Sequence, residues 1–168
     1  MKLIQTQTLA STTLGVTFSS IPATYTDLVL VCSLREAGTQ VQAGYAIRSI
    51  NGDNGTNYAA KVLYGTGAAA SSASYSASAY VPGYAVPGAS ATANTFGSIV
   101  VTFPNYTSSS AKVFSVEAVM ENNGATSFQE VIAGSWTGTA AINSFKIDYS
   151  YSGFVAGSVL SLYGITHA

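Results

Sequence analysis

Apolar and polar residues alternate with a period of two along most of the chain, which is the pattern of a half-buried β-strand. The clearest example lies in residues 144–150, where Phe145, Ile147 and Tyr149 share one side and polar residues share the other. Such a strand has one dry side and one side in contact with solvent or a partner. By contrast, residues 28–32 form a continuous apolar run, which predicts a strand that is buried on both faces.

The same pattern recurs from one end of the chain to the other, and helical periodicity is nearly absent. We expect strands near residues 14–18, 28–32, 45–50, 57–64, 99–103, 114–120, 128–136, 145–149 and 159–165. Turn-forming residues separate them, including a hairpin signal at Asn122, Asn123 and Gly124. The sequence therefore predicts a single domain over residues 1–168, an all-β antiparallel sandwich of about eight to ten strands with a jelly-roll-like topology.

The segment at about residues 65–94 breaks the alternation. It is rich in Ala, Ser and Gly, and it contains three tyrosines and two prolines: Tyr75, Tyr80, Tyr84, Pro82 and Pro87. Proline cannot donate to the hydrogen-bond ladder of a central strand. We therefore expect a long, exposed loop here.

The tyrosines of this segment are the best candidates for a binding or interface surface. Tyr combined with Ser and Gly is typical of adaptable binding loops, because the Tyr side chain offers broad contact with few rotatable bonds. One hypothesis is that Tyr75, Tyr80 and Tyr84 contact glycans on a host surface. The other, which we favour, is a loop ordered by a neighbouring subunit, because few charged or amide side chains accompany the tyrosines to bind sugar hydroxyls.

The chain carries few charges. Charged residues make up 8% of the sequence, against about 25% in an ordinary soluble domain. Because charged residues are depleted in the cores of protein interfaces, we expect a protein that is largely covered by its neighbours. The six Lys and Arg residues are scattered, so we expect neither nucleic acid nor an anionic membrane among the partners.

The sequence offers no convincing catalytic set, so we do not expect an enzyme or a cofactor. His167 is the one histidine in the chain, and we expect it in a frayed tail, where it cannot complete a histidine-dependent triad. Glu117 and Glu130 could meet across a hairpin as the two carboxylates of a glycosidase. We interpret them instead as solvated residues of a sheet.

Three further residue types need an interpretation. Asn51, Asp53 and Asn54 supply oxygen ligands suited to a hard cation such as calcium; a polar turn is the interpretation we favour, and no metal is expected. Trp136 shares its strand side with Phe128 and Ile132, which favours core packing over a sugar-binding platform. Cys32 is the single cysteine and is expected in the core.

Four stretches near the two ends of the chain are distinctive: residues 16–22 (VTFSSIP), 25–28 (YTDL), 154–158 (FVAGS) and 162–165 (LYGI). They resemble small virion proteins of tailed bacteriophages, which occur as separate chains or as modules of tail fibres. The resemblance implies a virion protein that assembles in the host cytoplasm and lies on the exterior of the particle, and it implies no catalytic residues. The first residues of the chain accordingly lack the continuous apolar stretch of a secretory signal.

The resemblance and the composition together give a functional expectation. We expect a capsid decoration (cement) protein, a homotrimer that binds the major capsid protein on the outside of the head. The alternative is a tail-fibre or receptor-binding protein that contacts host surface polysaccharide. A polysaccharide-degrading enzyme built on Glu117 and Glu130 is the least favoured hypothesis.

Overall fold

The computed structural model describes residues 1–121, 124, 126–149 and 151–167. Within them the regular structure consists of strands and one short 3-10 turn, η1 (Ile50–Gly52). The strands are β1 (Lys2–Thr8), β2 (Gly15–Phe18), β3 (Asp27–Leu34), β4 (Gln42–Arg48), β5 (Tyr58–Gly65), β6 (Ala70–Ser78), β7 (Val81–Pro87), β8 (Gly97–Phe103), β9 (Lys112–Met120), β10 (Phe128–Trp136), β11 (Phe145–Asp148) and β12 (Val159–Ile165). No helix in this part of the chain has the length and apolar character that crossing a membrane requires.

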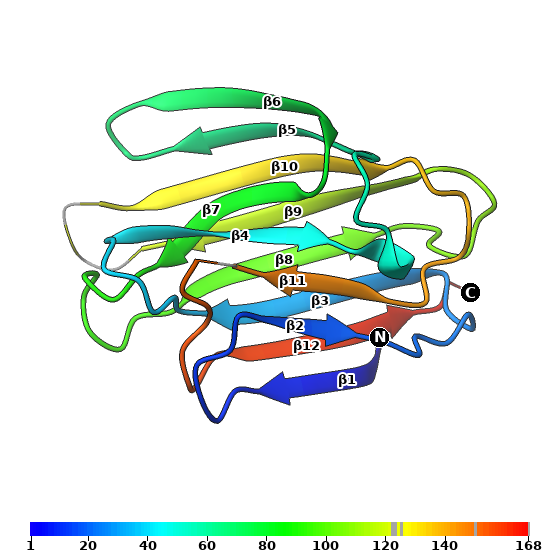
Figure 1. The fold of residues 1–168 in the computed structure, drawn as a ribbon, viewed down its shortest axis with the longest axis horizontal. Helices are drawn as coiled ribbons and strands as arrows, with labels where there is room; N and C mark the ends of the chain where they lie inside the picture. The colour runs from blue at the N-terminus through cyan, green and yellow to red at the C-terminus, as the bar shows by residue number, and fades with distance from the viewer. Residues whose placement is uncertain (122–123, 125, 150, 168) are drawn as a thin grey trace.

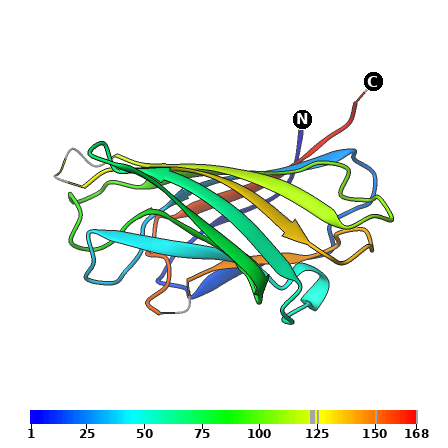
Figure 2. The same cartoon turned by 90° about the horizontal axis from the view of Figure 1, so that it is seen from above.

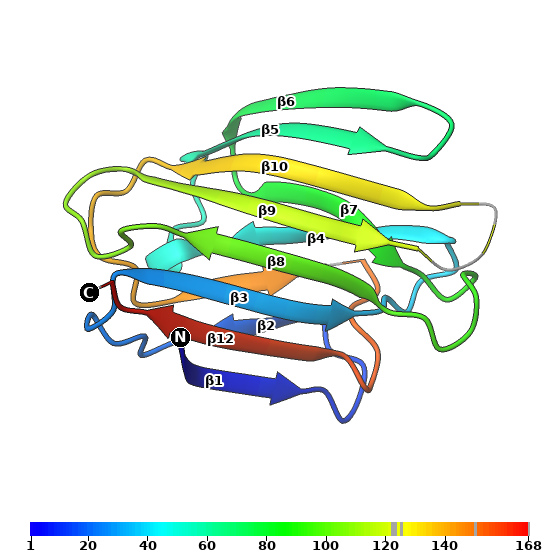
Figure 3. The same ribbon diagram turned by 180° about the vertical axis from the view of Figure 1, so that it is seen from behind.

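The strands form two antiparallel sheets that pack face to face. The large sheet has eight strands in the order β1-β12-β3-β8-β9-β10-β5-β6, and the small sheet has four in the order β2-β11-β4-β7. Figure 1 shows the small sheet in front, Figure 3 shows the large sheet from the other side, and Figure 2 shows the two layers from above. From β2 onward the chain passes repeatedly between the sheets, as in a jelly roll.

The predicted antiparallel sandwich is therefore confirmed, with more strands than the expected eight to ten. The nine expected strands all form, and β1, β6 and β7 are additional. The expected hairpin between β9 and β10 joins strands that do pair antiparallel. Of its turn, Asn122 and Asn123 lie outside the described residues.

The core lies between the two sheets and is made of the inward side chains that the alternation predicts. Phenylalanine rings join the layers: Phe145 of the small sheet lies 5.2 Å from Phe103 of the large sheet, measured between ring centroids, and 5.3 Å from Phe18 beside it. Cys32 is buried here, as expected, and burial raises the pKa of its thiol far above the ordinary value. Trp136 is also buried, as the sequence predicts.

The strand over residues 28–32 is not buried on both faces along its whole length. In β3 the side chains of Leu28, Leu30 and Cys32 enter the core, whereas Val31 is 39% exposed. The reason is that nothing in the described part of the chain covers the outer side of the large sheet at this point (Figure 3). The continuous apolar run therefore indicates a strand whose two faces are both apolar, although the second sheet covers only the inner one.

The prediction of a long exposed loop over residues 65–94 is wrong, because this segment forms β6 and β7. Both are edge strands: β6 pairs with β5, and β7 pairs with β4. An edge strand uses one side of its backbone for the ladder, so prolines such as Pro82 and Pro87 are tolerated there. Val81 and Val86 of β7 are fully buried in the core, which a run dominated by Ala, Gly and Pro does not suggest.

Candidate functional site

The carboxylates expected as an alternative catalytic pair lie on opposite faces of the large sheet. Glu117 is opposite Val131 in the register of β9 and β10, and Glu130 is opposite Ala118. Successive side chains of a strand point to opposite faces, so Glu117 is exposed and Glu130 is buried. They cannot act on one bond, and the interpretation of Glu130 as a solvated residue is wrong.

Glu130 instead joins the large sheet to the small one. Its carboxylate accepts hydrogen bonds from the Tyr45 hydroxyl at 2.9 Å, from the Tyr84 backbone N–H at 2.9 Å and from the Ala85 N–H at 3.2 Å. The two N–H groups belong to residues at the irregularity in the β4–β7 ladder, between the pairs Ala43–Val86 and Tyr45–Gly83. Burial raises the pKa of the Glu130 carboxyl, although these hydrogen bonds act in the opposite direction.

His167 does not lie in a frayed tail. Its Nε2 is 2.8 Å from Oδ2 of Asp27, and its backbone N–H donates to the Thr26 hydroxyl. The contact fixes the end of the chain beside the start of β3. It brings no nucleophile to the imidazole, so it serves as a tether between the two segments.

The candidate metal residues hold a turn together. Asp53 accepts hydrogen bonds from the Trp136 indole N–H at 2.7 Å and from the Gly55 backbone N–H at 2.8 Å, and these bonds, with one from Asn57, lower the pKa of its carboxyl. Asn51 Oδ1 accepts from the backbone N–H of Asn143 at 2.8 Å, and Asn54 Oδ1 from the Ser49 hydroxyl at 2.5 Å. Across the described residues, no group of three or more His, Cys, Asp and Glu side chains converges as a metal site would require.

The three candidate tyrosines do meet, at a hollow on the outside of the small sheet. We call it the tyrosine cleft; it has a volume of about 450 Å³, which is within the range of small-ligand sites. It runs along β4, with Tyr75, Tyr80 and Tyr84 on the β7 flank and Tyr149 and Tyr151 on the β11 flank. Chain segments far apart in sequence thus place these five tyrosines, together with Tyr45 of β4, around one hollow.

A β-bulge positions the first flank of the cleft. The register of β5 and β6 shifts between Tyr58 and Ala60, opposite Ala77, whose φ of 48° lies in the left-handed region. Such a bulge bends a strand and increases its twist. The bend lies directly before the turn that carries Tyr80 from the large sheet to the small one.

Tyr75 and Tyr84 are held firmly. Their hydroxyl groups share a hydrogen bond, and the Tyr84 ring lies 6.4 Å from the rings of both Tyr64 and Phe128. Burial is the main cause that raises the pKa of the Tyr84 hydroxyl well above its ordinary value. These side chains form a preformed wall of the cleft.

Charged and amide side chains line the same cleft, which sequence reasoning missed. The Arg48 guanidinium donates to both Asp148 carboxylate oxygens, through Nε at 2.9 Å to each and through Nη2 at 2.6 Å to Oδ2. Lys146 Nζ lies 2.8 Å from the same carboxylate. Gln42 Nε2 donates to the Tyr84 carbonyl at 2.6 Å, and Gln40 lies at the rim.

The far flank was also missed. Tyr149 was expected on the dry side of its strand, but it is partly exposed, and its ring lies 5.4 Å from that of Tyr151, a side chain that is 85% exposed. The spacing of two tyrosines just beyond a clean strand is a signal that could have been used. Nothing in the local sequence indicates that this pair faces Tyr80.

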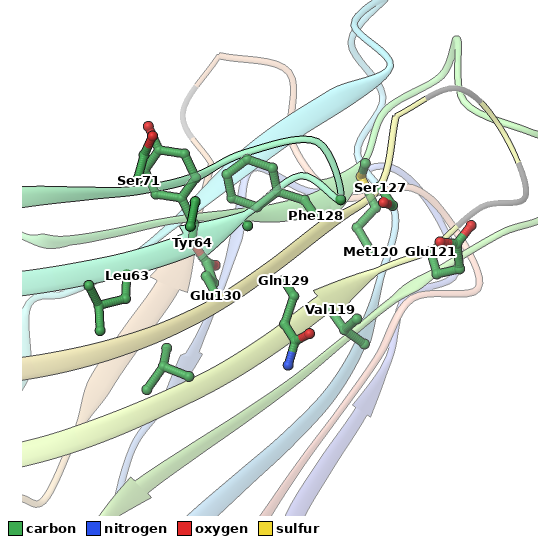
Figure 4. Close-up of a pocket in the computed structure, with 14 residues that line it drawn as sticks. Leu63, Tyr64, Ser71, Val119, Met120, Glu121, Ser127, Phe128, Gln129 and Glu130 are labelled. Carbon is green, nitrogen blue, oxygen red and sulfur yellow. The ribbon is translucent and has the colours of Figure 1, made fainter.

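A second feature is the outer face of the large sheet, the side away from the core. Its outward side chains on the five strands at its centre are Val29, Val31 and Ser33 of β3, Ser98, Val100 and Thr102 of β8, Val113, Ser115, Glu117 and Val119 of β9, Gln129, Val131, Ala133 and Ser135 of β10, and Ala59, Lys61 and Leu63 of β5. Two of these seventeen are charged. Figure 4 shows Leu63, Val119 and Gln129 projecting from this face, with Tyr64 and Phe128 on the other.

Several apolar side chains of the outer face are open to water. Leu63 is 63% exposed, Val113 is 62% and Val131 is 48%. Exposed apolar side chains that gather on one sheet face with few charges are typical of an interaction site. The face is also hollowed where Leu63, Val119 and Gln129 meet the hairpin end of β9 and β10 (Figure 4).

Burial reduces the surface charge further. The chain has thirteen Asp, Glu, Lys and Arg residues, and six of them are buried: Asp27, Arg35, Glu36, Lys112, Glu130 and Asp148. Seven charged side chains therefore remain to hydrate the whole surface. Two of the seven, Arg48 and Lys146, already pair with Asp148.

A scan against protein-family models matched no family, and a search of curated proteins found no match. The function must therefore be argued from the two surfaces described above.

Proposed function

We propose that this protein is a non-enzymatic structural protein of a tailed-bacteriophage virion, a decoration protein that binds the outside of the head. In this role the outer face of the large sheet is covered, by neighbouring copies and by the major capsid protein. The resemblance of residues 16–22, 25–28, 154–158 and 162–165 to small virion proteins supports the setting. The proposal includes self-association into a homotrimer.

The outer face is the observation that carries the proposal. A protein that stays alone in water is expected to keep charged side chains on so broad a sheet face. Here the centre of the face has one cation and one anion, Lys61 and Glu117, among valines, alanines and serines. Depletion of charge together with exposed apolar area is what distinguishes the centre of a protein interface.

The fold gives the proposal indirect support, because other proteins with this architecture have structural roles in viruses. Jelly rolls occur in viral capsid proteins and in lectins, although a fold alone does not decide a function. The closed core suits a subunit that packs on a lattice without changing shape.

Purified particles test the proposal directly. Electron cryomicroscopy and quantitative mass spectrometry of virions should find this chain at hundreds of copies, distributed over the head with the outer face against the shell. A handful of copies at the tail, or a head density in which the outer face points to solvent, would contradict it.

The tyrosine cleft favours a second candidate function, a tail-fibre or receptor-binding protein that contacts host glycans. The cleft combines aromatic rings with amide and guanidinium groups, which the sequence alone did not suggest. Location at the tail, together with loss of host adsorption in a Tyr80→Ala variant, would support this role over decoration.

A further inference from the structure

We infer that the tyrosine cleft binds a neutral saccharide, with a pyranose ring lying against the exposed faces of Tyr80 and Tyr151. The inference concerns the isolated domain, and it holds whether the chain lies on the head or at the tail. It goes beyond the decoration role, because that role uses the outer face of the other sheet.

The exposed tyrosines carry the first step. Tyr80 is 41% exposed and Tyr151 is 85% exposed, and both line the cleft from opposite flanks of β4. A pyranose has one face made of C–H groups, which packs on an aromatic ring by dispersion and by contact with the electron-rich face. Two exposed rings bordering one hollow match a flat ligand with an apolar face.

The floor of the cleft is closely packed. Gly44 and Ala46 of β4 and Pro82 of β7 present small side chains on this side of the small sheet. A Cβ atom on Gly44 would lie 2.9 Å from the Gly83 carbonyl and 3.1 Å from the Tyr149 ring. The Tyr149 ring therefore packs directly on the Gly44 backbone, which is buried beneath it.

The polar groups of the cleft include an acceptor and a donor that can serve the hydroxyls of a saccharide. Gln42 donates to the Tyr84 carbonyl through Nε2, which fixes its amide and leaves Oε1 as an acceptor. Arg48 uses Nε and Nη2 on Asp148, so its Nη1 group remains as a donor to a ligand. Donors and acceptors that surround an apolar contact are the arrangement by which small-molecule sites fix orientation.

The pairing of Arg48 with Asp148 points to a neutral ligand. The Asp148 carboxylate is 1% exposed and contacts both Arg48 and Lys146, so it offsets one of their two positive charges and already pairs with the Arg48 guanidinium. An anionic sugar would have to compete with Asp148 for the guanidinium. A neutral glycan needs only hydrogen bonds.

The walls of the cleft are preorganised, which lowers the entropic cost of binding. Tyr75 and Tyr84 bond to each other, and Arg48 is held by three hydrogen bonds. A ligand therefore has to order few side chains beyond Tyr80 and Tyr151.

A glycan array probed with the purified full chain tests the inference, followed by NMR titration with the best neutral oligosaccharide. We expect amide shifts to change at Gly44, Ala46 and Gly83, because these line the floor. Tyr80→Ala and Tyr151→Ala should each weaken binding about tenfold, the size of one lost aromatic contact. Tyr163→Ala, a tyrosine of β12 in the large sheet, should bind like the native chain.

Three results would overturn the inference: no glycan bound by the native chain, shift changes confined to residues outside the cleft, or equal affinity of both cleft variants and the native chain. Binding restricted to acidic glycans and abolished by high salt would also overturn it, since it would indicate a screened charge contact. Melting curves of the variants verify folding, because both side chains are exposed. None of these outcomes bears on the position of the chain on the virion.

Discussion

At the scale of single residues, the buried charges bind backbone groups and hold loops in place. Arg35 Nη1 donates to the carbonyls of Thr92 and Thr95 at 2.8 and 2.9 Å, and its Nη2 donates to that of Ala91 at 3.1 Å. Lys112 Nζ donates to the carbonyls of Ser108 and Ser110. A buried ion is tolerated when hydrogen bonds satisfy it. In this protein the few charged residues therefore stabilise the fold more than they hydrate the surface.

Glu130 should make stability depend on pH. Burial raises the pKa of its carboxyl above the ordinary value of 4.5, so the folded state binds this proton more readily than the unfolded chain does. The free energy of unfolding should then fall as pH rises from about 4.5 through the raised pKa of the folded protein. Urea unfolding of the native chain and of Glu130→Gln across this range measures the effect.

The amide of Glu130→Gln can still accept the Tyr84 and Ala85 N–H bonds but cannot ionise. The native chain should therefore lose stability relative to the variant as pH rises through the window. A constant difference between the two proteins at every pH would show that Glu130 carries the same charge in the folded and unfolded states.

At the scale of elements, β6 and β7 connect the two sheets and build one flank of the tyrosine cleft. β6 is mostly exposed at the edge of the large sheet, whereas β7 is buried on the edge of the small one. The Glu130 carboxylate binds N–H groups at the irregularity in the β4–β7 ladder. Backbone donors at an interruption of one sheet are thereby satisfied by a side chain of the other sheet.

The burial of β7 predicts a clear contrast between two substitutions. Val86→Ala should lower the free energy of unfolding by about 2 kcal/mol, because it removes two methyl groups from a fully buried site. Ser76→Ala, on the exposed side of β6, should change it by less than about 0.5 kcal/mol. Chemical denaturation followed by Trp136 fluorescence reports both. An unchanged midpoint for Val86→Ala would mean that β7 is not part of the core.

The sequence predicts elements with strong alternation and fails where local composition and tertiary context disagree. Phe145 and Ile147 reveal their strand and its inward side without help from the rest of the chain. Val81 and Val86 do not, because the residues around them are Pro, Gly and Ala, and only pairing with β4 makes them core residues. Likewise, composition made Tyr80 a candidate binding residue, whereas Arg48, Asp148 and Tyr151 line the same cleft only through the folding of β4 and β11.

At the scale of the whole molecule, the two candidate surfaces lie on opposite sides of the sandwich. The outer face belongs to the large sheet, and the tyrosine cleft lies on the outside of the small sheet. A subunit that binds a shell through the first would present the second to the surroundings. The proposed decoration role and the inferred saccharide site are therefore compatible in one molecule.

Sedimentation velocity of the purified chain tests the central claim, that the outer face of the large sheet is an interface. We expect the native chain to sediment as an oligomer of the mass of a trimer, and Val131→Lys to sediment as a monomer with an unchanged melting temperature. Thr17→Lys, which adds the same charge to the exposed side of β2 in the small sheet, should remain oligomeric. A native chain that stays monomeric at the highest soluble concentration would contradict the account.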